Sequence, residues 1–197
     1  NGSDSIEVIV NDLGNTDDLG RDLEAVASLA IDVIPVNDAP SLNYPINNLI
    51  VKEDEPLDIL GVFVTDDAIE DSGSEMKITL SVNDGTLTYD TAGLTFESGD
   101  VGQSTAVFTG LLDDVNNALA TLIYQGNANH NGGDLLSITV DDQGFLGGGS
   151  LTDTITPTIF IEAVNDSPTS LTTIADVDTN EYETFSVDLN NLFTDLD

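Results

Sequence analysis

Cysteine, tryptophan and positive charge are absent or scarce in this sequence of 197 residues. The absence of cysteine excludes disulfide bonds and thiolate metal sites. Only 3 lysine and arginine residues stand against 37 aspartate and glutamate residues, which gives a formal net charge of -34. A surface this acidic repels nucleic acids and anionic membranes. We therefore expect neither as a partner, and no insertion of this segment into a membrane.

Groups typical of catalytic centres are scarce as well. His130 is the only histidine, it has no cysteine or obvious serine partner, and we assign it no catalytic role. Carboxylate pairs suited to glycoside hydrolysis exist, but sugar clefts usually carry aromatic platforms, and this chain has no tryptophan and 4 tyrosines. No apolar run is long enough to cross a bilayer, and no signal peptide stands at the start. We expect a soluble, non-enzymatic segment whose export signal lies elsewhere.

The sequence does contain a series of short segments typical of strands. Hydrophobic residues make up 40% of the chain, and the prevalence of valine, isoleucine, leucine and phenylalanine suits an all-β fold with a sandwich core. The segment 111–122 instead has apolar residues at helical spacing and predicts a short helix. Asp84-Gly85 is typical of a two-residue hairpin turn. Strands are predicted at 48–51, 57–63, 76–82, 85–89, 94–96, 104–109, 135–140 and 153–163.

An internal repeat runs through the chain. "VIPVNDAPS" (33–41) and "IEAVNDSPT" (161–169) share the pattern Val-Asn-Asp-small-Pro, and we call them the first and the second joint. The segment before each joint is also repeated, because "IEVIVNDLG" (6–14) resembles "LSITVDDQG" (136–144). Repetition of several motifs in one order indicates a tandem array.

The repeat divides the chain into three parts. Residues 51–68 after the first joint parallel residues 178–197 after the second. We therefore interpret residues 1–38 as the closing strands of a preceding unit, 39–166 as a complete unit, and 167–197 as the opening strands of a following unit. Isolated end pieces would expose unpaired strand edges. Exchange of these strands between copies is an open alternative.

The joints have the chemistry of a stiff, cation-binding connection. Proline lacks an amide donor and has a fixed φ angle, so it ends a strand and stiffens the link that follows. The asparagine and aspartate before it offer oxygens, and Ca²⁺ binds six to eight of them. Two carboxylates about 5 Å apart repel by about 3 kcal/mol at an effective dielectric near 20. Acidic turns near a joint would therefore favour a bound cation, although a purely solubilising acidic surface is the alternative.

Two stretches resemble a known family. "ITVDDQG" followed by "TPTIFIEAVNDSP" (138–168) is similar to the end of a cadherin repeat. "LSVNDGTLT" (80–88) and "TGLLDDVNNALATLIYQGNANHNGGDLLSITVDDQG" (109–144) resemble the cadherin-like tandem repeats of giant bacterial surface proteins. The resemblance covers the whole chain in register. It implies Greek-key, immunoglobulin-like or cadherin-like β-sandwiches in tandem, with Ca²⁺ at the linkers, in a secreted or cell-surface adhesin.

The resemblance also implies metal ligands. Asn37 and Asp38 match the linker ligands of the first joint, and Asn165 and Asp166 match those of the second. Acidic turns at the base of each unit and beside each joint complete the set, and we expect several of them to reach one pole. The candidate ligands are Asn37, Asp38, Glu53, Glu55, Asp66, Asp67, Asp71, Asp142, Asn165, Asp166, Glu181, Asp195 and Asp197.

Three further matches are less complete. Glu53 or Glu55, and Glu181, match the family's glutamate at the base of the following domain. "TDLD" (194–197) matches its Asp-x-Asp element, whereas "TDDA" (65–68) matches it imperfectly. The family's mid-domain Leu-Asp-Arg-Glu is absent, so the number of ions per joint is not predicted.

Two loops are interpreted without metal chemistry. "NANHNGGD" (127–134) is either a polar loop, which we favour, or an intradomain cation site that uses Asp134. "QGFLGGGS" (143–150) lacks the lysine and the following helix of a phosphate-binding loop, so we expect a flexible connection.

The leading functional hypothesis is a calcium-rigidified extender repeat of a large bacterial adhesin. Its partners would be the neighbouring repeats of the same chain and, in one version, other copies end to end. The alternatives are a filament or surface-layer subunit completed by neighbouring copies, and a Ca²⁺-dependent carbohydrate- or protein-binding module. The sequence does not identify the ligand of the whole protein.

Overall fold

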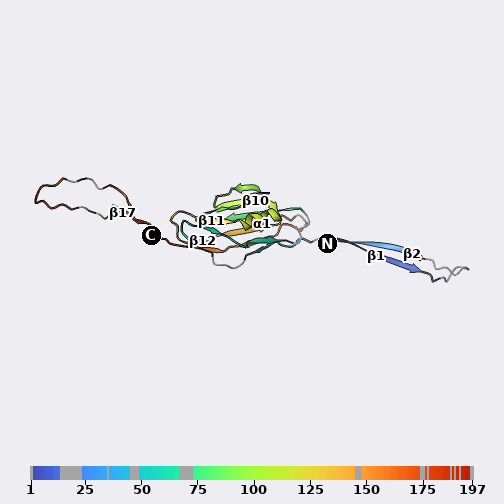
Figure 1. The fold of residues 1–197 in the computed structure, drawn as a ribbon. Coiled ribbons are helices and arrows are strands. Elements are labelled where there is room, and N and C mark those ends of the chain that lie inside the picture. The colour runs from blue at the N-terminus through green and yellow to red at the C-terminus, as the bar shows by residue number, and fades with distance from the viewer. Residues whose placement is uncertain are drawn as a thin grey trace.

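The structure is a computed structural model of the chain. It describes residues 2–13, 24–34, 36–44, 49–66, 73–144, 148–173, 176, 178–186, 188, 190 and 192–195. Figure 1 shows a central body from which a long hairpin projects at one end and a chain segment with little secondary structure at the other. The hairpin consists of β1 (Gly2–Asn11) and β2 (Glu24–Val33). The segment at the other end contains the short strands β16 (Thr169–Ser170) and β17 (Phe193–Thr194).

The central body is a β-sandwich with one helix, which confirms the predicted all-β fold class. One sheet has the strand order β14-β13-β7-β10-β9, two smaller sheets have the orders β12-β15-β4 and β5-β11-β8, and β3 pairs with β6. The strands of the first sheet are β7 (Glu75–Ser81), β9 (Thr95–Gly99), β10 (Thr105–Leu111), β13 (Ser137–Asp141) and β14 (Thr152–Ile155). The remaining strands are β3 (Ser41–Asn43), β4 (Leu49–Lys52), β5 (Pro56–Asp58), β6 (Phe63–Thr65), β8 (Gly85–Thr88), β11 (Ile123–Gly126), β12 (Gly132–Leu135) and β15 (Thr158–Glu162).

The core forms where alternating side chains of the sheets face one another. In β7 the side chains of Met76, Ile78 and Leu80 are buried, whereas the residues between them are not. In β13 Ile138 and Val140 are buried and alternate in the same way with residues that are not. This period of two is the pattern of a strand with one face inward. The alternation in the sequence therefore places the core correctly.

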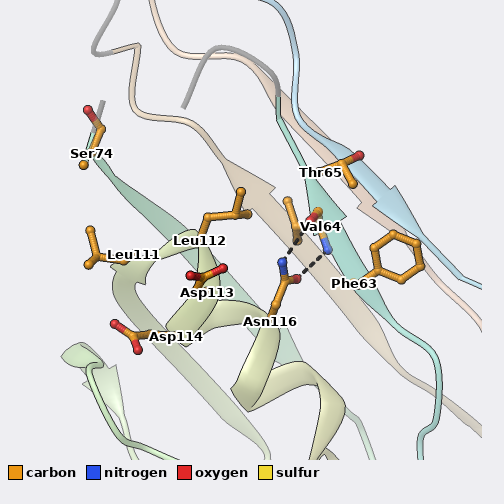
Figure 2. Close-up of a pocket in the computed structure, with 10 residues that line it drawn as sticks. Phe63, Val64, Thr65, Ser74, Leu111, Leu112, Asp113, Asp114 and Asn116 are labelled. Atoms are coloured by element: carbon orange, nitrogen blue, oxygen red, sulfur yellow. Dashed lines mark hydrogen bonds between the residues drawn. The ribbon is translucent and has the colours of Figure 1, made fainter. Parts of the chain in front are cut away.

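The helix α1 (Leu112–Ala120) lies within the predicted segment and packs on the body through Val115, Ala118 and Leu119. Its side chain Asn116 holds strand β6: the Val64 amide donates to Asn116 Oδ1 at 2.7 Å, and Asn116 Nδ2 donates to the Val64 carbonyl at 3.0 Å (Figure 2). An amide side chain thus replaces the next strand at this edge of β6. In the part of the chain that the structure describes, no helix is long and apolar enough to cross a membrane.

Three predicted strands are broken in the structure, and one of them, 135–140, is divided at Leu136 between β12 and β13. The strand predicted at 57–63 is divided into β5 and β6. Ile59 still extends the β5–β11 pairing by donating its amide to the Leu122 carbonyl at 2.8 Å, and the chain then turns at Gly61, which has a φ of 80°, before β6 pairs with β3. The strand predicted at 153–163 is divided near Pro157, where the chain passes from the sheet containing β13 to the sheet containing β12. Proline cannot donate to a ladder, and strands often end where it stands.

The hairpin predicted at Asp84-Gly85 is wrong. Strands β7 and β8 belong to different sheets, so the chain turns a corner instead of folding back on itself. The amides of Asn83 and Asp84 donate to the carboxylate of Asp134 at 2.9 and 3.0 Å. Gly85 is required there because a Cβ atom would collide with the Tyr124 ring. The carboxylate of Asp134, which is distant in the sequence, therefore determines the geometry of this corner, although the dipeptide Asp84-Gly85 on its own favours a hairpin.

The projecting hairpin has the same pairing register as the closing strands of the sandwich. In the sandwich, β12 pairs with β15 and β13 pairs with β14, and in the hairpin the single strand β1 makes the equivalent contacts with β2. The matching pairs are Gly2↔Val33 with Gly132↔Ile161, Asp4↔Ile31 with Asp134↔Ile159, and Asn11↔Glu24 with Asp141↔Thr152.

The opening strands repeat as well. Ser41, the first residue after the first joint proline, pairs with Thr65 in the β3–β6 ladder. Thr169, the first residue after the second joint proline, pairs with Thr194 in the β16–β17 ladder. The chain after the second joint thus begins with the same antiparallel contact as the chain after the first.

Candidate functional site at the two poles

The two joints lie at opposite ends of the sandwich, which we call the first and the second pole. Strand β15 leads into the second joint, and it runs parallel to β4 with Glu162 opposite Lys52. Both strands therefore end at the second pole. Strand β3 follows the first joint and runs antiparallel to β6, so β6 ends at the first pole. Figure 1 shows the hairpin and the β16–β17 segment leaving from these opposite ends.

A fully buried carboxylate holds the first joint to the sandwich. Asp142 is 0% exposed, and its Oδ2 accepts a hydrogen bond of 2.6 Å from Asn37 Nδ2. Its Oδ1 accepts from the amides of Gly144 and Leu151 at 2.9 and 2.8 Å. Asn37 also donates to the Gly149 carbonyl at 3.2 Å. Asp142 therefore connects the joint, the 143–150 loop and the end of β13.

The turn after β13 places this carboxylate. The Gln143 amide donates to Asp141 Oδ1 at 2.7 Å, and Gln143 has a φ of 58°. Gly144 follows with a φ of 68°, and a Cβ atom there would lie 2.6 Å from the Gly149 carbonyl carbon. An aspartate-led turn and a glycine with positive φ are thus both required. The described ends of the loop predicted to be flexible are fixed by these contacts.

The other candidates of the first pole have different environments. Asp66 directly follows β6 and is 3% exposed, whereas Asp38 is exposed in the joint. Asp67 and Asp71 lie outside the described residues. Next to the joint, Leu42 donates its amide to Asp153 Oδ2 at 2.8 Å, which anchors β3 beside β14.

The second pole is organised around Glu53. This side chain is 5% exposed, and its Oε1 accepts a 2.5 Å hydrogen bond from the amide of Val164 in the second joint. The Glu53 amide donates to the Glu162 carbonyl at 3.0 Å. Within the joint, Asn165 Nδ2 donates to the Asp166 carbonyl at 2.8 Å. A buried carboxylate therefore holds the second joint, as one does at the first.

Acidic residues also lie in the turn after β4 and beyond the second joint. Glu55 is exposed and its amide closes the turn by donating to the Lys52 carbonyl at 3.2 Å. Asp54 has a φ of 63°, and its Oδ1 accepts the Asn129 amide at 3.1 Å. Glu181 and Asp195 are exposed and lie beyond the second joint, in the segment that carries β17. Asp197 lies outside the described residues.

The structure separates acids that we expected to share one pole. Glu53 and Glu55 follow β4 and lie at the second pole, whereas Asp66 follows β6 and lies at the first. The reason is that β5 and β6 together make one crossing of the sandwich, so the turns before and after them are at opposite ends. Each pole therefore combines a joint with acids from one of the two turns only.

Asp134 is a structural carboxylate that sequence analysis placed in a loop. It is 2% exposed in β12 and accepts from the amides of Asn83, Asp84 and Leu135 at 2.7 to 3.0 Å and from the Tyr124 hydroxyl at 2.8 Å. Burial, reinforced by this hydrogen bond, raises the pKa of Tyr124 well above its ordinary value. Four donors satisfy the carboxylate within the protein. Asp134 therefore fixes the corner between β7 and β8.

The oxygen atoms at the poles are of the types that bind hard cations. They are carboxylate, amide and carbonyl oxygens, which Ca²⁺ prefers. Among the described residues, no group of three or more histidine, cysteine, aspartate or glutamate side chains is placed to hold a metal ion. Three candidates, Asp67, Asp71 and Asp197, lie outside that part of the chain.

A cavity of about 530 Å³ lies between β6 and the start of α1 (Figure 2). Its polar groups have structural roles, because Asn116 is bonded to Val64 and Asp113 and Asp114 belong to the first turn of the helix, where the helix dipole favours acids. We assign no ligand to it. It is lined by Phe63, Val64, Thr65, Gly73, Ser74, Leu111, Leu112, Asp113, Asp114 and Asn116.

Comparison with known proteins does not assign the chain to a family. No family model and no curated protein sequence matches the chain. Among solved structures, the chain is similar to the N-terminal domain of the Streptococcus gordonii adhesin Sgo0707, with 11% sequence identity and a TM-score of 0.26. The match covers 70% of this chain and 36% of that one. A likeness at this TM-score carries no argument about function.

Proposed function

We propose that this chain is a spacer segment of a large bacterial secreted or cell-surface adhesin, with no enzymatic activity of its own. The observation that carries the proposal is that the two joints leave opposite poles of one sandwich and that a buried carboxylate holds each of them. Asp142 binds the side chain of Asn37 at the first pole, and Glu53 binds the backbone of Val164 at the second. Connections fixed at opposite ends suit units that follow one another in a line.

The proposed units are those of the repeat: a complete sandwich at 39–166, closing strands at 1–38 and opening strands at 167–197. The β16–β17 contact supports this division, because it reproduces the β3–β6 contact at the equivalent position after a joint. The shared register of the two sets of closing strands supports it from the other end.

Calcium is the proposed stiffening agent at the joints. At the first pole the residues that would hold it are Asn37, Asp38 and Asp66, with Asp67 and Asp71 nearby in sequence. At the second pole they are Glu53, Glu55, Asn165 and Asp166 from this unit, and Glu181, Asp195 and Asp197 from the segment beyond the joint. With a net charge of -34, carboxylates gathered at a joint repel one another, and a divalent cation would neutralise them. Asp142 would support the site by holding Asn37, since both its oxygens already accept hydrogen bonds.

A calcium titration tests this proposal. We expect millimolar Ca²⁺, the range of extracellular sites, to raise the melting temperature and to lengthen the maximum dimension in small-angle scattering. Asp38→Ala should weaken both responses, whereas Glu7→Gln, which removes a negative charge in the middle of β1, should leave them unchanged. NaCl at equal ionic strength is the control for general screening. An equal response to NaCl and CaCl₂ would show that the acids only solubilise the surface.

A self-assembling filament or surface-layer subunit is the second candidate, because β1 and β2 expose large apolar side chains along their whole length. Sedimentation of the chain at increasing concentration separates the two. A spacer segment stays monomeric with and without calcium, whereas a filament subunit forms end-to-end oligomers.

A further inference from the structure

One face of the hairpin β1–β2 is apolar and exposed. Alternation places six large apolar side chains on it, each between 37% and 62% exposed. Five of them have counterparts in the closing strands of the sandwich, and those counterparts are between 0% and 5% exposed. In the hairpin the six are Ile6, Val8, Val10, Leu29, Ile31 and Val33, and in the sandwich the counterparts are Leu136, Ile138, Val140, Ile159 and Ile161.

A carboxylate lies in the same place on both faces. Asp4 pairs with Ile31 as Asp134 pairs with Ile159. The Ser5 amide donates to Asp4 Oδ1 at 2.7 Å, and the Leu135 amide donates to Asp134 Oδ1 at 2.7 Å. Asp4 therefore makes the hydrogen bond with the following amide that Asp134 also makes, and it lacks the bonds that Asp134 receives from Asn83, Asp84 and Tyr124.

The turn at the end of the hairpin strand is also equivalent. The Leu13 amide donates to Asn11 Oδ1 at 2.7 Å with a φ of 55° at Leu13. In the sandwich the Gln143 amide donates to Asp141 Oδ1 at 2.7 Å with a φ of 58° at Gln143. Leucine has no local reason to adopt a positive φ. The turn after β1 therefore has the same backbone conformation as the turn after β13.

We propose that β1–β2 is the closing hairpin of a further β-sandwich whose body precedes it in the polypeptide. That body resembles residues 39–130: it covers the apolar face, and it presents to Asp4 two successive backbone amides and a tyrosine hydroxyl, as Asn83, Asp84 and Tyr124 do for Asp134. The inference rests on the proposed tandem organisation and names the partner of its first unit.

Asp4 distinguishes this partner from a second hairpin. If two hairpins packed their apolar faces together, each Asp4 would be buried against aliphatic side chains that donate no hydrogen bond. A buried ionised carboxylate whose donor is the Ser5 amide alone is strongly unfavourable. A sandwich body with a corner like that between β7 and β8 supplies the donors. The charge of Asp4 therefore favours packing against such a body over packing against a second hairpin.

A fusion protein tests the proposal with the body that this chain already contains. Residues 39–130 are joined directly to residue 1 of the complete chain, which requires no linker because Asn1 is equivalent to Asn131. We expect backbone amides of β1 and β2 to exchange with solvent at least about 100-fold more slowly in the fusion than in the unextended chain. A second version carries Ala25→Asp and Ala27→Ile, which restore the counterparts of Asp153 and Ile155. The proposal is overturned if neither version slows exchange in the hairpin while the sandwich at 39–166 stays protected.

A pair of substitutions makes the test specific. Asp4→Leu should abolish the added protection in the fusion, because the amides and the hydroxyl of the body would lose their acceptor. In the unextended chain the same change should increase self-association in sedimentation experiments. Ser3→Ala, on the other face of the hairpin, should do neither. Equal effects of the two substitutions, or a wild-type chain that already dimerises through its hairpin, would contradict the proposal.

All of these measurements are made in EDTA. If calcium fails to stiffen the joints, the proposed stiffening mechanism is wrong, but the exchange experiment is unaffected. If calcium acts as proposed and the hairpin stays unprotected in both fusions, only the assignment of the hairpin is wrong.

Discussion

The hairpin β1–β2 and the closing strands of the sandwich differ in their surroundings and agree in their backbone. Both have the same pairing register, and both have an aspartate at the equivalent position, Asp4 in one and Asp134 in the other. Both also end in a turn with a positive φ, at Leu13 and at Gln143. One is covered by the body of the sandwich, and the other is exposed on both faces. Register therefore follows from local alternation and turn chemistry, whereas burial depends on elements that lie elsewhere in the chain.

The aspartates show what the body adds. Asp4 and Asp134 make the same bond to the next amide, but only Asp134 reaches the corner amides and Tyr124. A carboxylate inside a core is tolerated only where donors surround it. Substitutions at equivalent positions of the two regions should therefore have very different costs.

The largest difference is expected for the aspartate pair. Asp134→Ala removes the side-chain acceptor of three backbone amides and the shorter of the two hydrogen bonds of the Tyr124 hydroxyl, and we expect it to lower the free energy of unfolding of the sandwich by about 4 kcal/mol. Asp4→Ala should change it by less than about 0.5 kcal/mol, as for an exposed side chain. Urea denaturation followed by tyrosine fluorescence measures both, since all tyrosines lie after residue 38. Similar losses at the two positions would mean that the hairpin contributes to the stability of the sandwich.

The second difference concerns the apolar faces. Ile138 is 0% exposed and its counterpart Val8 is 50% exposed. We expect Ile138→Ala to lower the free energy of unfolding by about 3 kcal/mol through lost packing and an internal cavity. Val8→Ala should cost less than about 0.5 kcal/mol in the unextended chain, and more in the fusion with residues 39–130. A costly Val8→Ala in the unextended chain would show that the hairpin face is already covered.

The smallest effect is a pH dependence confined to the sandwich. Burial, reinforced by the nearby Asp100 carboxylate, raises the pKa of Tyr89 to about 12. Because the fold favours the neutral phenol, this contribution is complete below pH 10 and is lost as the pH rises towards 12. At pH 11 we expect a loss of about 1 kcal/mol from Tyr89. Thermal melts at pH 9 and pH 11 measure it, and Tyr89→Phe should reduce the difference; an unchanged difference would assign it to Tyr124 or to other groups.

Much of the fold could be predicted from periodicity. The alternation of β7 and β13, the helical spacing that becomes α1 and the order of motifs around the joints all reflect local chemistry. The repeat extends further than the segments 6–14 and 136–144, to the residues that precede them. Asn-Gly-x-Asp occurs at residues 1–4 and again at 131–134, and this signal could have placed Asp134 in a strand equivalent to the start of β1.

The errors have non-local causes. Asp84-Gly85 favours a hairpin on its own, but Asp134, fifty residues away, takes the amides of the corner. The separation of Glu53 from Asp66 depends on the direction of β5 and β6 across the sandwich, which a list of acidic turns does not contain. The roles of Asp142 and Glu53 as holders of the joints likewise follow only from the packed structure. Metal binding stays a prediction.

The parallel ladder between β4 and β15 has a consequence for a chain under tension. The first joint leads through β3 into β4, and β15 leads out to the second joint, with Leu49 opposite Ile159 and Lys52 opposite Glu162. Pulling the joints apart draws the two strands in opposite directions along their length, so their hydrogen bonds are sheared together and cannot open one after another. Resistance to such a pull depends on the rate of unfolding more than on its free energy. A row of units connected in this way would carry a drag force from a distant attachment without unravelling.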